Sequence, residues 1–115
     1  MVAERGSDKI KMYVIIWEFY VKAEHLSEFE KIYREGGTWV DLFQKQNGYL
    51  GTELLRAPGD HQRYITIDRW SSSADYESFL SQWKKEYEEL DRQCEGLTEQ
   101  EILFGKWKVV DYEVR

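Results

Sequence analysis

The spacing of apolar residues switches between two periods along this chain, and the order of the switches limits what it can fold into. Runs rich in β-branched and aromatic residues predict strands at 12–21, 49–56, 63–70 and 101–114. Apolar residues at helical spacing predict helices at 24–35, 38–46 and 73–95. The resulting order, β-α-β-β-α-β, predicts a ferredoxin-like α+β fold, in which two helical regions cover one face of a four-stranded antiparallel sheet.

Turn and capping residues place the boundaries of these elements. The Gly36-Gly37 pair interrupts the first helical region, and Thr38 is typical of a new helix N-cap. The turn residues of "APGDHQ" join the second and third strands into an antiparallel hairpin. Ser72 or Ser73 can cap the last helix, which is predicted to run unbroken to residue 95.

Length and composition predict one domain over residues 1–115, with an ordered core from about 12 to 112 and a flexible segment at 1–11. The aromatic share of 16% is more large flat surface than so small a core absorbs, which indicates a pocket or a subunit interface. The single cysteine, Cys94, excludes an internal disulfide and is predicted to be a small buried residue near a helix end.

Charge and hydropathy exclude two classes of partner. A formal net charge of −6 repels a phosphate backbone, so no nucleic acid is expected to bind. The longest apolar run is too short for a bilayer and contains Glu18, so no membrane partner is expected. The first residues, "MVAERGSDKIK", lack the apolar segment of a secretion signal, which predicts a cytoplasmic protein.

Alternation along residues 63–70 assigns their side chains to the two faces of the sheet. Ile65 and Ile67 point to one side, and Thr66, Asp68 and Trp70 point to the other. Helices are expected on one face only, so the isoleucine face needs another cover. We expect that cover to be the sheet of a second copy, which makes the protein a homodimer.

The "NGYLGTELL" entry to the second strand and the "RYITIDRWSSSADYESF" passage from the third strand into the last helix resemble the antibiotic biosynthesis monooxygenase family. The resemblance covers residues 12–110 and rests on a glycine before the second strand and a Trp-x-Ser-type step after the third. It implies a dimeric α+β barrel. It also implies an enzyme that binds an electron-rich aromatic substrate between sheet and helices and oxidises it with O₂, without flavin, haem or metal.

Residue by residue, the resemblance is partial. Trp70 and Tyr76 stand at the family's spacing, but Thr66 replaces an Asn, and a hydroxyl lacks the paired donor and acceptor of an amide. The quinol-oxidising branch tends to have a His where this chain has Phe79. The haem-degrading branch needs a His on the last helix, and no His follows His61, so haem breakdown is not expected.

The candidate catalytic residues follow from the face assignment and the resemblance, and they are Trp70, Tyr76, Asp68 and Thr66. Trp70 would stack on the substrate ring, Tyr76 and Thr66 would hydrogen-bond its oxygens, and Asp68 would act as general base. Burial would raise the pKa of Asp68 toward neutrality. The structural alternatives are a packing role for both aromatic residues and, for Asp68, either an ion pair with one of three cations (Arg69, Arg63 or Lys106) or an outward turn at a bulge.

The candidate substrate pocket is aromatic, which suits a flat ligand. Its expected residues are Trp17, Tyr33, Trp39, Tyr64, Phe79 and Trp83. For the first four, the alternative is packing in the core or in a subunit interface. Glu18 and Glu53 could approach Asp68 if their strands keep phase, and one register slip would send each outward. His25 and His61 have no ligand neighbours at metal-binding spacing, so no metal is expected.

The leading hypothesis is a homodimeric monooxygenase that acts on a small aromatic or quinone-like molecule in each subunit without a cofactor. Two alternatives remain open. One is a non-catalytic dimer of the same fold that binds a small ligand or has a structural role. The other is a base-catalysed isomerase or lyase, which needs only a base and a hydrogen-bond donor.

Overall fold

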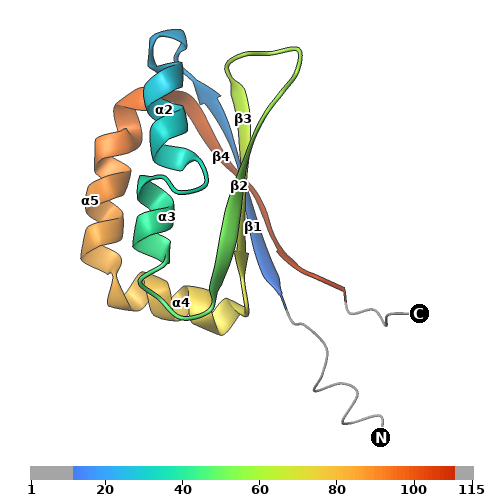
Figure 1. The fold of residues 1–115 in the computed structure, drawn as a ribbon, viewed down its shortest axis with the longest axis vertical. Coiled ribbons are helices and arrows are strands. Elements are labelled where there is room, and N and C mark those ends of the chain that lie inside the picture. The colour runs from blue at the N-terminus through green and yellow to red at the C-terminus, as the bar shows by residue number, and fades with distance from the viewer. Residues whose placement is uncertain (1–11, 111–115) are drawn as a thin grey trace, which may run out of the picture.

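A computed structural model describes residues 12–110, and these form one antiparallel sheet with helices packed on one face (Figure 1). The strands lie in the order β2-β3-β1-β4. Their bounds are β1 (Tyr13–Val21), β2 (Tyr49–Arg56), β3 (Arg63–Trp70) and β4 (Thr98–Lys108). This is the predicted ferredoxin-like arrangement, hairpin included. The expectations for residues 1–11 and for 111–112 lie outside the described residues.

The helical layer consists of short elements joined at sharp breaks. The first region contains η1 (Ala23–His25), α2 (Leu26–Tyr33) and α3 (Thr38–Phe43), and the second contains α4 (Ser73–Gln82), α5 (Lys84–Cys94) and η2 (Glu95–Leu97). Cys94 is buried at the end of α5, as predicted. None of the helices within residues 12–110 is both long and apolar enough to cross a bilayer.

The prediction of one unbroken last helix is wrong, because the chain bends at Trp83 (φ −114°, ψ 28°). Figure 1 shows α4 crossing one end of the sheet and α5 running back along it. The bend lets Phe79 pack on Trp70 at that end, with ring centroids 5.4 Å apart, while Leu90 reaches the rest of the core. A straight helix could not follow the sheet over both stretches.

The Gly36-Gly37 pair turns the chain between α2 and α3. Gly36 has a positive φ of 78°, and a Cβ at Gly37 would lie 2.6 Å from the Lys31 carbonyl oxygen. Gly37, rather than the predicted Thr38, is the N-cap of α3, because only a residue without a side chain fits against the end of α2. The turn brings Tyr33 and Trp39 together, with ring centroids 6.1 Å apart.

The two sequence motifs that suggested a family lie against each other. Gly48, before β2, accepts a 2.7 Å hydrogen bond from the backbone N–H of Ser71, after β3. Gly48 has a φ of 98°, and a Cβ there would lie 2.4 Å from a carboxylate oxygen of Asp75 at the start of α4. The glycine therefore lets the β2 entry and the α4 entry share one end of the sheet.

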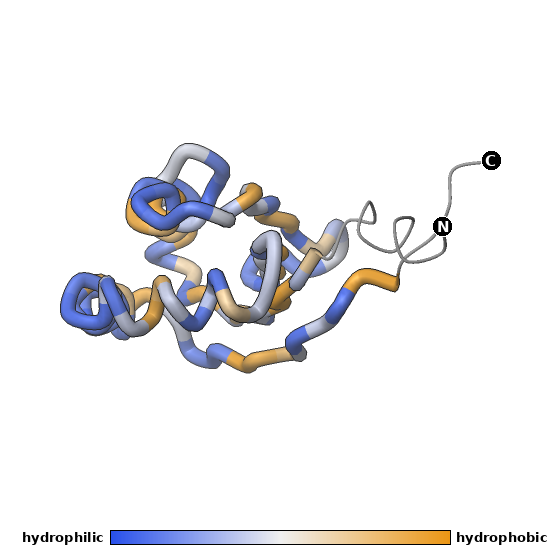
Figure 2. Tube along the Cα trace, turned by 90° about the horizontal axis from the view of Figure 1, so that it is seen from below, coloured by the Kyte–Doolittle hydropathy of each residue, from blue (hydrophilic) through white to orange (hydrophobic). Residues whose placement is uncertain are grey.

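The face of the sheet opposite the helices is apolar and open. Ile65 and Ile67 lie on it half-buried, and residues opposite them in register share the face. Its exposed large side chains include Leu55, Ile102 and Trp107. Figure 2 shows the tube of β4 turning hydrophobic along its middle, at the edge of the molecule.

The start of α4 depends on one serine. The Ser72 hydroxyl accepts a 3.1 Å hydrogen bond from the backbone N–H of Asp75, whereas Ser73 is exposed at the first helical position. We expect Ser72→Ala to lower the free energy of unfolding by about 1 kcal/mol, which lowers Tm by about 4 °C. Thermal unfolding measures this, with Ser73→Ala as the matched control. An equal loss in both variants would contradict the capping assignment.

Candidate functional site

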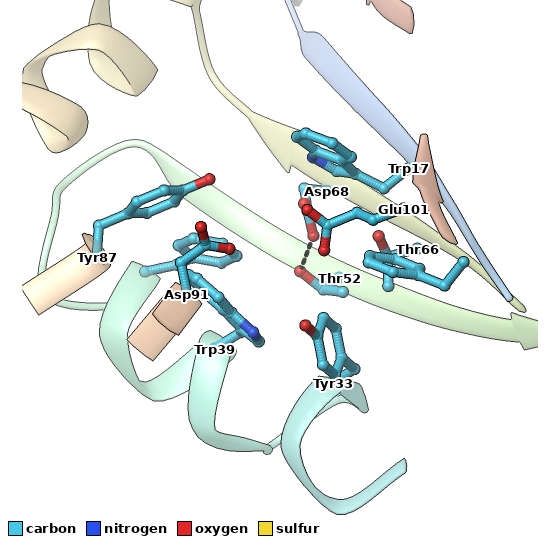
Figure 3. A pocket seen from close by; sticks show the side chains of 11 residues that line it. Trp17, Tyr33, Trp39, Thr52, Thr66, Asp68, Tyr87, Asp91 and Glu101 are labelled. Atoms are coloured by element: carbon cyan, nitrogen blue, oxygen red, sulfur yellow. Dashed lines mark hydrogen bonds between the residues drawn. The ribbon is translucent and has the colours of Figure 1, made fainter. Parts of the chain in front are cut away.

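A cavity opens between the helix-facing side of the sheet and helices α2, α3 and α5 (Figure 3). It contains about 420 Å³ of empty space, with the solvent at its mouth included. All four strands contribute to its walls. The lining residues are Trp17, Phe19, Tyr33, Trp39, Phe43, Thr52, Thr66, Asp68, Tyr87, Asp91 and Glu101.

Strand register places the polar side chains of the cavity floor side by side. Thr52 on β2 is directly opposite Asp68 on β3, and Thr66 is directly opposite Trp17 on β1. Directly opposite residues in an antiparallel pair point to the same face, which here is the face under the helices. Thr52, Thr66 and Asp68 are all at least nine-tenths buried.

A chain of hydrogen bonds holds the carboxylate of Asp68. The Thr52 hydroxyl donates to Asp68 Oδ1 at 2.6 Å. The Tyr49 hydroxyl lies 2.6 Å from the same Thr52 oxygen. A hydroxyl has one proton, so Thr52, which donates to Asp68, accepts from Tyr49. The second oxygen of Asp68 receives no hydrogen bond from a described residue and remains available to a ligand.

The environment of Asp68 shifts the pKa of its carboxyl group toward neutrality. Burial raises the pKa of its carboxyl group to about 6, and the hydrogen bond from Thr52 opposes part of this rise. No cation pairs with it among residues 12–110, since Arg63 pairs with Glu18 and Arg69 pairs with Glu53. The predicted alternative, an ion pair of Asp68, is therefore wrong for both of these arginines.

Aromatic rings form the upper walls of the cavity. Tyr33 and Trp39 come from α2 and α3, and Phe43 lies one turn beyond Trp39. The Tyr87 hydroxyl points from α5 into the space above the sheet (Figure 3). Burial raises the pKa of Tyr87 well above the ordinary value for a tyrosine, so its phenol is a neutral hydrogen-bond donor at physiological pH.

Two more carboxylates face the same space from opposite walls. Asp91 lies one turn beyond Tyr87 on α5, and Glu101 lies on β4 (Figure 3). Burial raises the pKa of Asp91, and the nearby charge of Glu95 raises it further. Glu101 is exposed as a residue, but partial burial of its carboxyl group and then the charge of Asp91 raise its pKa. The two carboxylates therefore repel each other across the cavity.

The structure brings only part of the predicted catalytic set to the cavity. Thr66 and Asp68 line it, but Trp70 does not: its ring is fully buried, and Phe43 separates it from the space. Tyr76 also lies outside the lining, with its ring centroid 5.6 Å from that of Trp70. The reason is the short passage from β3 to α4, which presses the first turn of α4 onto Trp70.

The predicted pocket set is corrected in the same way. Trp17, Tyr33 and Trp39 line the cavity, whereas Tyr64, Phe79 and Trp83 do not. Tyr64 is buried beside Phe29 and donates a 2.5 Å hydrogen bond to Glu30. Phe79 packs on Trp70. Trp83 lies at the bend before α5, and the Lys45 ammonium group lies over its ring. Glu18 and Glu53 point to the open face and form ion pairs there.

Sequence reasoning missed several residues of the site. They are Phe19, Phe43, Thr52, Tyr87, Asp91 and Glu101, together with the supporting Tyr49. Thr52 had a signal, because alternation and the predicted hairpin place it opposite Asp68. Tyr87 was visible only as part of the helical apolar stripe. Asp91 and Glu101 had no such signal, because their directions depend on the bend at Trp83 and on a register shift in β4.

The described residues offer no evident metal centre. Among residues 12–110, no three His, Cys, Asp or Glu side chains are grouped so as to hold a metal ion. His25 lies 3.5 Å from Glu28 on the surface, and His61 is exposed in the hairpin turn. The residues that face the cavity carry aromatic rings, hydroxyls and carboxylates, which can hold an organic ligand.

The family model for antibiotic biosynthesis monooxygenases matches residues 12–87, about two thirds of the chain. The chain belongs to the antibiotic biosynthesis monooxygenase family. The matched segment contains Asp68, Thr52, Thr66 and Tyr87, but it ends before Asp91 and Glu101. No curated protein matches the sequence significantly.

Solved structures support the same fold for this family member. SnoaB, a cofactor-independent oxygenase from Streptomyces nogalater, is 16% identical with a TM-score of 0.69, over 90% of this chain and 96% of that chain. PA3566 from Pseudomonas aeruginosa is 16% identical with a TM-score of 0.63, over 91% and 96%. A conserved protein from Methanosarcina mazei is 9% identical with a TM-score of 0.65, over 92% and 95%. Identities this low establish a common fold and no common substrate.

The raised pKa of Asp68 predicts a pH-dependent stability. Between the ordinary pKa of 3.8 and the raised value near 6, the folded protein holds a proton that the unfolded chain has lost, so stability falls as pH rises through this window. As pH rises from about 4 to about 7, we expect the free energy of unfolding of Asp68→Asn to increase relative to that of the wild type by up to about 3 kcal/mol. Urea unfolding across this range measures the difference.

The control for this experiment is Asp41→Asn, which removes an exposed carboxylate from α3. It reports how stability responds to the loss of one surface charge. If the wild type and Asp68→Asn keep a constant difference from pH 4 to pH 7, Asp68 is not a destabilised buried acid.

Proposed function

We propose that this protein is a monooxygenase that oxidises a small, electron-rich aromatic or quinone-like molecule with O₂ and without a cofactor. The observation that carries the proposal is the buried carboxylate of Asp68, with a pKa of about 6 and one free oxygen, inside an aromatic cavity. Membership of the family and the shared fold with SnoaB support the reaction class.

The substrate ring would lie between the sheet and the aromatic walls. Trp17, Tyr33 and Trp39 offer ring surfaces, and Thr66 offers a hydroxyl with no partner among residues 12–110. Tyr87 takes the role that the sequence assigned to Tyr76, because its hydroxyl points into the cavity. Both donors would stabilise negative charge that develops on a substrate oxygen.

The chemistry begins with a proton transfer to Asp68. Its ionised form removes a proton from an activated C–H or O–H of the substrate, and the resulting anion passes an electron to O₂. Recombination forms a C–O bond. For an activated methylene, the peroxide takes the proton back and loses water, which leaves a carbonyl. One oxygen atom enters the product, and the other leaves as water with the two methylene hydrogens.

Other residues support this step without contacting the substrate. Thr52 is a positioning residue, because it holds one oxygen of Asp68 and leaves the other free. Trp70 and Tyr76 fill the end of the core behind Phe43. Burial and the charge of Asp68 raise the pKa of Tyr76 to about 12, so it remains a neutral packing residue.

Oxygen consumption on anthrones, hydroquinones and catechols tests these roles. We expect Asp68→Asn to lower kcat by about 100-fold or more, because the base is lost. Tyr87→Phe should lower it by roughly tenfold through the loss of one hydrogen bond to developing charge. Tyr76→Phe is the matched control and should keep most of the activity. An oxygen electrode measures the rates, and Tm confirms that each variant is folded.

Three outcomes would change the assignment. Full turnover in Asp68→Asn would remove Asp68 as the base. A larger loss in Tyr76→Phe than in Tyr87→Phe would restore the role expected from the family spacing. Exchange of substrate hydrogen with solvent deuterium, without O₂ uptake by any compound, would instead indicate an isomerase or lyase that uses the same base.

We further propose that the protein is a homodimer in which the open faces of two sheets pack together. The support is an apolar face that no described helix covers, with half-buried isoleucines at its centre and exposed large side chains around them. The ion pairs of Glu18 with Arg63 and Glu53 with Arg69 lie among these residues and would mark the polar part of the interface.

Light scattering at micromolar concentration tests the dimer. We expect a particle of twice the 13.9 kDa chain mass. The Ile67→Glu variant should be more monomeric than the wild type, because the substitution places a carboxylate opposite Ile16 in the apolar centre of the face. Lys31→Glu, on the exposed side of α2, is the control and should leave the mass unchanged. A wild-type particle of one chain mass would reject the dimer.

A further inference from the structure

The walls of the cavity hold three carboxylates and no basic side chain. Asp68, Asp91 and Glu101 reach it from β3, α5 and β4, and no Lys, Arg or His belongs to the lining (Figure 3). Two cations on neighbouring elements are engaged elsewhere. Lys106 Nζ lies 5.5 Å from the ring centroid of Tyr76, and Lys45 Nζ lies 5.3 Å from that of Trp83.

The two outer carboxylates have no countercharge. Within residues 12–110, neither Asp91 nor Glu101 forms an ion pair or a side-chain hydrogen bond. The ion pairs among these residues lie on the open face, at the start of α2, and between α2 and the end of β2. Each has a raised pKa, and that of Glu101 is raised in part by Asp91. A positive group between them would relieve this repulsion.

A second observation, an unpaired hydroxyl on the cavity floor, shows where a polar atom of a ligand would bind. Thr66 is 4% exposed, yet its hydroxyl forms no hydrogen bond with any described residue and lines the cavity. The Thr66 oxygen is not among the fully buried, unpartnered polar atoms of residues 12–110, so it faces the space of the cavity, where a polar atom of a bound molecule can form a hydrogen bond with it. Thr66 lies on the sheet floor with Asp68, so it marks the polar inner end of the ligand.

The aromatic walls favour an organic cation over a metal ion. Trp17, Trp39 and Tyr87 surround the space, and ring faces attract ammonium groups. The carboxylates are not grouped to coordinate a metal, since residues 12–110 contain no cluster of three such ligands. Rings with separated carboxylates are the arrangement that recognises an amine attached to a flat skeleton.

We propose that the ligand of this cavity is an aromatic amine in its protonated form, with its ammonium group between Asp91 and Glu101 and its ring against Trp17 and Trp39. The inference rests on the proposed function, because it uses the same cavity, and it adds the class of substrate. The ring end reaches Thr66 and Asp68, where oxidation would occur. Anionic aromatic molecules are excluded by the same charges.

Anaerobic binding of three probes of nearly equal shape tests the proposal: naphthylmethylamine, naphthylmethanol and naphthoate. Isothermal titration at pH 7.5 should show the amine binding at least about tenfold more tightly than the alcohol, with naphthoate weakest. Asp91→Asn and Glu101→Gln should each reduce the affinity for the amine about fivefold and leave that for the alcohol unchanged. Glu88→Gln, which removes an exposed carboxylate on α5 outside the lining, is the matched control.

The double variant Asp91→Asn/Glu101→Gln must bind naphthylmethylamine no more tightly than naphthylmethanol. Equal affinities for the amine and the alcohol, no measurable binding of the amine, or a preference that survives in the double variant would each overturn the proposal. The readout is equilibrium binding without O₂, so it is independent of turnover. Selective amine binding without any oxygenase activity would overturn the proposed function alone, and turnover of neutral quinols without amine preference would overturn this inference alone.

Discussion

The site depends above all on how the protein holds one carboxylate away from water. Transfer of a carboxylate into a protein interior costs several kcal/mol unless donors replace its hydration. An arginine partner would compensate for this and would also hold the pKa of Asp68 low. Here the compensation comes from the Thr52 hydroxyl, itself supported by Tyr49. This weaker donor leaves the carboxyl group with a pKa near 6 and therefore able to accept a proton.

The cavity above this carboxylate exists because the helical layer is broken in two places. The Gly36-Gly37 turn redirects the chain, so that Tyr33 at the end of α2 and Trp39 at the start of α3 face the same space. The bend at Trp83 lets α4 fill one end of the core while α5 stays further along the sheet. Continuous helices would pack along the whole sheet and fill the space with side chains. The breaks thus set the boundary between solid core and cavity.

The predictable part of the site is the part governed by strand periodicity. Alternation alone places Thr66 and Asp68 beneath the helices, and the hairpin then places Thr52 beside Asp68. Residues at helix junctions are different. Trp70 and Tyr76 have the family spacing, but whether they meet a ligand depends on how closely α4 approaches β3. Glu101 depends on a register shift between β1 and β4 near Gly105, which alternation cannot anticipate.

The acidic walls act differently on binding and on reactivity. An anion formed beside Asp68 is repelled by Asp91 and Glu101, although Glu101 is exposed and Asp91 is half-buried, so solvent at the cavity mouth screens part of this repulsion. That repulsion raises the energy of the anion and makes it a better electron donor to O₂, a neutral molecule that carries the charge away from the ring. Without compensation, it would also weaken binding. An ammonium group at the mouth restores the binding energy there, while the reacting end stays under the repulsion that favours electron transfer.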